Sequence, residues 1–104
     1  MELSDLKKQS DLSFEVATAK RNALERARSR QVVAYNGSIF SADADTINLV
    51  DTLKKTHKTF FILDSNENPC EITNPEEFLE TLLKRNQEAL NEYHQLYNQL
   101  KKRV

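Results

Sequence analysis

The sequence has few of the residues that interrupt helices and few that carry reactive chemistry. It contains one glycine, two prolines, one cysteine and no tryptophan in 104 residues. One glycine is too few for a glycine-rich phosphate loop, and so few breakers argue against a β-sandwich or a barrel. A single cysteine excludes disulfides within the chain and is typical of a reducing compartment. The composition therefore favours long helices.

Charge and hydropathy narrow the function classes further. The 15 Lys and Arg residues nearly balance the 16 Asp and Glu residues, which argues against a strongly basic nucleic-acid-binding protein. A run of 18 apolar residues is missing, so we expect no membrane span. The first residues, Met1 to Asp5, lack the basic start and apolar core of a secretory signal. We therefore expect a cytoplasmic protein, with residues 1–104 forming a single domain.

Apolar periodicity and turn signals predict an α+β fold. A small antiparallel sheet made of two hairpins is expected to pack against long N-terminal and C-terminal helices, with a coiled-coil extension. The expected elements are a helix over 4–29, a hairpin over 32–41, a helix over 43–57, a strand–loop–strand over 59–73 and a long helix over 75–103.

The dipeptide Asn36-Gly37, between two short β-prone runs, is a strong hairpin signal. A type I′ turn needs positive φ at both central residues, which asparagine and glycine tolerate best. A two-residue loop of this kind places two pairs opposite each other: Tyr35 with Ser38 and Val33 with Phe40.

Two helix starts are also visible. Asp43 is the expected N-cap of the short helix, and Asn74 is the expected N-cap of the long helix. Pro75 occupies the first helical position, and Glu77 stands where the carboxylate of a capping box is found. The long helix is therefore expected to begin sharply at Pro75.

The long helix carries an apolar seam with a period of 3.5 residues, which is typical of a coiled coil. Its members are Leu79, Leu83, Asn86, Leu90, Tyr93, Tyr97, Leu100 and Val104. The distal part, Leu90 to Val104, is expected to pack against the first helix or against a second copy. The predicted interaction residues are Asn86, Leu90, Tyr93, Tyr97 and Leu100.

Asn86 is the informative polar residue of this seam, and it has two interpretations. An isolated asparagine can fix the register and oligomer number of a coiled coil. Alternatively, it reaches solvent at the edge of a core.

The residues with reactive side chains do not form a recognisable site. Cys70, His57 and His94 are separated, so they match neither a zinc site nor a nucleophile with its base. We predict no catalytic residue, no metal, no cofactor and no small-molecule substrate, and we do not expect an enzyme.

A locally basic stretch in the first helix suggests an alternative function. Its arginines are Arg21, Arg26, Arg28 and Arg30. They could contact nucleic acid in a small regulator, but aromatic residues are not interleaved with them. A solvated helix face is the favoured interpretation, so we do not expect nucleic acid as the main partner.

Two segments, residues 20–26 and 33–43, carry a family resemblance, most specifically from Tyr35 to Asp43. With these segments the chain resembles a bacteriophage and prophage tail-region family that is catalogued as a domain of unknown function. The resemblance covers about residues 18–101, although family members commonly carry a tryptophan where this chain has Phe60-Phe61. It implies a non-enzymatic protein–protein interaction module, associated with the phage tail or its assembly. The implied location is the bacterial cytoplasm or the virion tail.

Overall fold

The computed structural model describes the backbone of residues 3–102 and the side chains of residues 12–102. The described backbone forms three helices and two antiparallel two-stranded sheets, which confirms the predicted α+β class. In chain order the elements are α1 (Leu3–Arg30), β1 (Val32–Tyr35), β2 (Ser38–Ser41), α2 (Ala44–Lys54), β3 (Phe60–Leu63), β4 (Pro69–Ile72) and α3 (Pro75–Lys101).

The first hairpin has the predicted turn and register. Asn36 and Gly37 adopt φ values of 48° and 79°, as the central residues of a type I′ turn require. Tyr35 pairs with Ser38 and Val33 pairs with Phe40, while Val33 and Phe40 are buried. The local sequence therefore determines which face of this hairpin points into the core.

Both predicted N-caps are confirmed. The side chain of Asp43 accepts a hydrogen bond from the Thr46 N–H at 2.9 Å, and Asn74 accepts from the Glu77 N–H at 3.3 Å. The capping box at α3 differs in one respect, because the backbone N–H of Asn74 donates to the Tyr35 hydroxyl at 3.0 Å. The carboxylate of Glu77 instead accepts from the side-chain amide of Asn74 at 3.0 Å. A long-range contact thus replaces half of the local motif.

Helix α2 ends earlier than expected, at Lys54 instead of residue 57. The backbone N–H groups of Thr56 and His57 both donate to the carbonyl of Leu53, at 3.2 and 2.9 Å. This turn closes the helix and lets the chain enter β3 at Phe60. Helix α1, by contrast, extends one residue beyond each of its expected ends. Val104, the last position of the predicted seam, lies outside the described residues.

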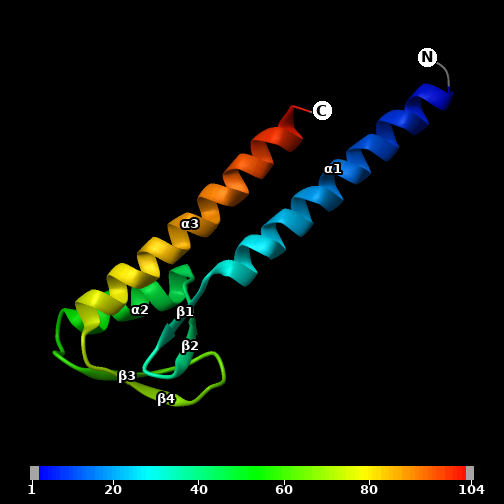
Figure 1. Cartoon of the computed structure of the whole chain (residues 1–104). Coiled ribbons are helices and arrows are strands. Elements are labelled where there is room, and N and C mark those ends of the chain that lie inside the picture. The colour runs from blue at the N-terminus through cyan, green and yellow to red at the C-terminus, as the bar shows by residue number, and fades with distance from the viewer. Residues whose placement is uncertain (1–2, 103–104) are drawn as a thin grey trace.

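The core lies where the two hairpins, α2 and the first half of α3 meet (Figure 1). Phe78 of α3 occupies its centre, with its ring 5.0 Å from that of Phe40 and 4.8 Å from that of Tyr35. The β-structure consists of two separate sheets, joined by a backbone hydrogen bond of 2.8 Å from the Ser65 N–H to the Ile39 carbonyl. The core residues are Val33, Phe40, Ala42, Val50, Phe60, Ile62, Cys70, Ile72, Phe78, Leu79 and Leu82.

Beyond this core, α1 and α3 run side by side in opposite directions and form a projecting helical arm (Figure 1). We define the helical arm as residues 16–30 of α1 with residues 85–101 of α3. Ala23 and Ala27 are buried along it, and such small side chains let two helices approach closely. The molecule measures 66 × 22 × 20 Å, and its radius of gyration is 19.3 Å. A compact chain of this length has a radius of gyration of about 13 Å. The arm, together with α1 where it extends past the end of α3 (Figure 1), therefore makes the molecule markedly elongated.

Candidate functional site

Helix α3 carries two parallel rows of apolar side chains that differ in exposure. The first row, which we call the buried stripe, consists of Leu82, Ala89 and Leu96. Leu82 and Ala89 are buried, and Leu96 lines a hollow together with Ala19 and Ala23 of α1. The buried stripe therefore faces the core and α1.

The second row, which we call the outer stripe, consists of Leu83, Leu90 and Tyr97. Their exposed fractions are 44%, 40% and 37%. Each lies one position after a member of the buried stripe, which turns it about 100° around the helix. Because the core and α1 pack on the buried stripe, the outer stripe stays partly open to solvent along α3.

The remaining predicted interaction residues lie between these two stripes. Tyr93 is half-buried, and its ring centroid lies 6.3 Å from that of Tyr97. Leu100 is also half-buried and lines a small hollow with Val16 of α1. The ammonium group of Lys20 lies 5.4 Å from the centre of the Tyr97 ring, close enough for a cation–π interaction. Lys20 of α1 therefore contacts one side of the Tyr97 ring.

Asn86 makes a contact that neither predicted interpretation included. Its side-chain amide donates a hydrogen bond of 2.9 Å to the carbonyl of Ala42, a completely buried residue between β2 and α2. Asn86 thus joins α3 to the chain segment that precedes α2. Sequence reasoning missed this contact because Ala42 lies 44 residues away and carries no polar side chain.

The structure does not bring the four predicted arginines onto one face of α1. Arg30 forms an ion pair with Glu92 of α3, and Arg26 lines a hollow between the helices. Arg21 and Arg28 lie seven residues apart and share a different face of α1. Nucleic-acid binding by these residues stays a prediction.

The separated reactive residues have ordinary surroundings. Cys70 is buried on β4, where its thiol lies 3.7 Å from the Glu71 carbonyl. The His57 ring is 2.8 Å from the Thr56 hydroxyl, and the His94 ring is 3.2 Å from the Asn98 amide. Within the described residues, no three His, Cys, Asp or Glu side chains lie together as metal ligands would. Across residues 3–102, none of the helices combines the length and apolar character of a membrane span.

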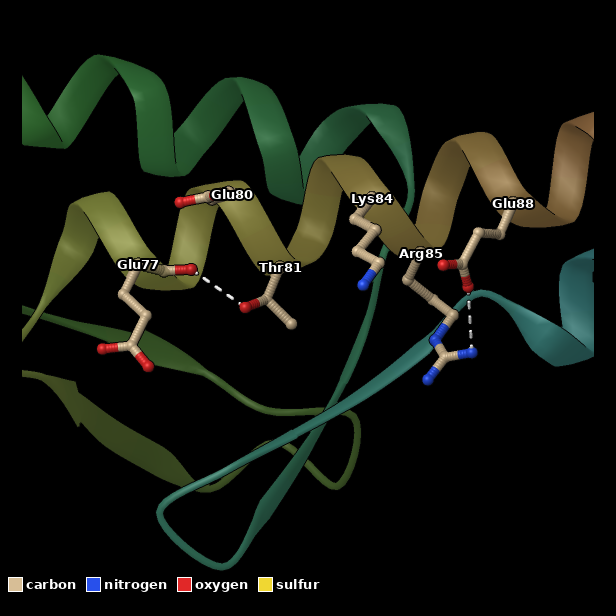
Figure 2. Close-up of a pocket in the computed structure, with 6 residues that line it drawn as sticks. All are labelled: Glu77, Glu80, Thr81, Lys84, Arg85 and Glu88. Atoms are coloured by element: carbon tan, nitrogen blue, oxygen red, sulfur yellow. Dashed lines mark hydrogen bonds and ion pairs between the residues drawn. The ribbon is translucent and has the colours of Figure 1, made fainter.

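A hollow of about 390 Å³ runs along α3, and Figure 2 shows the residues that line it. They are Glu77, Glu80, Thr81, Lys84, Arg85 and Glu88. The Thr81 hydroxyl donates to the Glu77 carbonyl at 2.9 Å, and Arg85 forms an ion pair with Glu88 at 3.3 Å. About half of each of these two paired side chains is exposed. Charges of both signs on such an open surface are typical of a solvated helix face and do not form an enclosed catalytic pocket.

No protein family, curated protein or solved structure was found to match the chain. The phage tail-region resemblance of residues 18–101 therefore stays a prediction, and the candidate site rests on the geometry of the helical arm. Along α3, the outer stripe is a row of large apolar side chains that remain about two-fifths exposed.

Proposed function

We propose that this protein is a protein–protein interaction module that binds a helix of its partner along the outer stripe. One observation carries the proposal. Leu83, Leu90 and Tyr97 recur every seven residues on the long helix α3 and remain about two-fifths exposed. An apolar row with this spacing fits the apolar face of another helix, as in coiled coils and helix-in-groove complexes.

The energetics of burial support this function. Covering a large apolar side chain completely stabilises a complex by about 1.5–3 kcal/mol. Because each outer-stripe side chain is already more than half covered, its remaining contribution is about 1 kcal/mol. The partner helix contributes a similar amount from its own side chains. The arm projects from the core, so a partner could reach this row without displacing the hairpins (Figure 1).

The resemblance supplies the proposed setting of this module. It places the protein with phage or prophage tails, either as a tail component or as an assembly factor in the bacterial cytoplasm. The proposal of a helix-binding module does not depend on that setting, since it rests on the outer stripe.

Site-specific photo-cross-linking tests the proposed function. A photoreactive amino acid at position 90 is expected to form discrete adducts with protein in cells that naturally express the chain. The matched control is position 91, an exposed asparagine that points about 100° away on the same helix. Equal labelling from both positions, or no adduct from position 90, would contradict the proposal.

A further inference from the structure

The identity of the helix that covers the outer stripe follows from the surface area, the charges and the spacing of α3. We propose that it is α3 of a second copy of this chain, packed antiparallel to the first. This inference rests on the proposed function, because it names the partner of the same surface.

The accessible surface is larger than a monomer of this size normally exposes. The chain has a mass of 12.0 kDa and an accessible surface of 7709 Å². Compact monomers of that mass expose about 6,000 Å². The excess, about 1,700 Å², is twice the roughly 800 Å² that each partner contributes to a standard interface. The elongated chain therefore exposes more surface than a compact fold would, and the outer stripe is part of that surface.

The distribution of charge along α3 selects the direction of the second helix. Glu76 and Glu80 lie near the N-terminal end of α3, whereas Lys101 and Lys102 lie at its C-terminal end. A parallel second copy would place like charges next to each other at both ends. An antiparallel copy places the acidic end of each helix beside the basic end of the other, which favours that orientation. A net charge of −1 adds little repulsion between copies.

The spacing of the outer stripe matches a two-fold axis at its central residue. Leu83 and Tyr97 each lie seven residues from Leu90. In an antiparallel pair centred on Leu90, the two Leu90 side chains meet at the axis. Leu83 of each copy then packs against Tyr97 of the other, and the contact extends over about 21 Å of helix. One surface thus pairs with itself, as a two-fold interface requires.

Exposed apolar side chains also lie elsewhere among the described residues, including Phe14 of α1 and the outer face of the β3–β4 hairpin. Phe61 and Leu63 of β3 are 67% and 63% exposed. This area lies on a four-residue strand and so lacks the seven-residue spacing of the outer stripe. It provides the control for the experiment, because a glutamate there would disrupt a rival interface but not the proposed one.

The mass in solution is the first test. Light scattering and sedimentation of the whole chain are expected to give twice 12.0 kDa. Leu90→Glu is expected to give the monomer mass with an unchanged circular dichroism spectrum, whereas Leu63→Glu is expected to remain dimeric. A wild-type chain that stays monomeric, or a dimer that dissociates with Leu63→Glu but not with Leu90→Glu, would overturn the proposal.

Disulfide formation tests the orientation. Native Cys70 is 7% exposed, so the wild-type chain under the same oxidation serves as the blank. Leu90→Cys is expected to form a covalent dimer with itself. Leu83→Cys and Tyr97→Cys are expected to cross-link with each other in a mixture but not with themselves. Self-cross-linking of Leu83→Cys and Tyr97→Cys would indicate a parallel pair and overturn the proposed one.

The two proposals fail in different ways. If the purified chain is monomeric but position 90 still cross-links to another protein in cells, the self-association is wrong and the proposed function stands. If position 90 cross-links to no protein and the chain is monomeric, both proposals are wrong.

Discussion

Replacing Asn86 with alanine tests the hydrogen bond that joins α3 to the segment between β2 and α2. The Asn86 amide lies 2.9 Å from the carbonyl of Ala42, and Ala42 is completely buried. Without this donor, the carbonyl of a completely buried residue loses its side-chain partner. An unsatisfied buried acceptor costs about 1–3 kcal/mol.

Part of this loss is offset within the helix. Alanine is a better helix former than asparagine by up to about 0.7 kcal/mol. We therefore expect Asn86→Ala to lower the free energy of unfolding by a net ~0.3–2.3 kcal/mol. For a chain of this length each kcal/mol lowers the melting temperature by about 4–8 °C.

The control for this variant is Asn91→Ala, an exposed position in the same helix. It gains the same helix propensity but loses no contact with Ala42, so we expect it to be neutral or slightly stabilising. Urea unfolding monitored by circular dichroism at 222 nm, at one protein concentration, measures both variants. Their difference isolates the hydrogen bond at about 1–3 kcal/mol.

Two outcomes would refute this reasoning. Equal stability of Asn86→Ala and Asn91→Ala would show that the contact with Ala42 contributes nothing. A change in the mass in solution on Asn86→Ala, with stability unchanged, would instead indicate that Asn86 determines the oligomeric state.

Three further predictions concern the core and the turns. Gly37→Val should destabilise by about 1–2 kcal/mol in a thermal melt, because a side chain at φ 79° is strained although it meets no neighbour within 4 Å; unchanged stability would contradict the type I′ turn. Leu82→Ala should lower the free energy of unfolding by about 2–5 kcal/mol, whereas Leu83→Ala should lower it by less than about 1 kcal/mol. Urea unfolding of monomeric protein measures both, and similar losses would show that the boundary of the core does not lie between these two residues. Tyr35→Phe should lower the free energy of unfolding by about 0.5–1.5 kcal/mol and speed hydrogen exchange of the Asn74 amide, because the Tyr35 hydroxyl accepts the Asn74 N–H at 3.0 Å. An unchanged exchange rate would refute that contact.

Features that depend on a few neighbouring residues were predictable. The Asn36-Gly37 turn determines the register of β1 and β2, and the caps at Asp43 and Asn74 mark where two helices begin. These interactions lie within four residues along the chain, so the amino-acid order alone determines them. By contrast, the end of α2 at Lys54 was predicted three residues too late.

The candidate site was predictable in part. The sequence indicates that α3 is apolar over a wide face, and Leu90 and Tyr97 were expected to form an interaction surface. It does not indicate that Leu82 and Ala89 would be covered while Leu83 and Leu90 would remain open. Each pair consists of adjacent apolar residues, and their burial depends on the side of α3 against which the core and α1 pack.

The scarcity of glycine and proline by itself determined that long helices dominate, and the one Asn-Gly pair determined a tight hairpin between them. The tertiary structure decided which side of α3 is exposed, and it joined Asn86 to Ala42 and the Tyr35 hydroxyl to Asn74. The physical reason is the range of the interactions. Turns and caps form between neighbours in the chain, whereas burial and these long-range hydrogen bonds depend on how distant segments pack together.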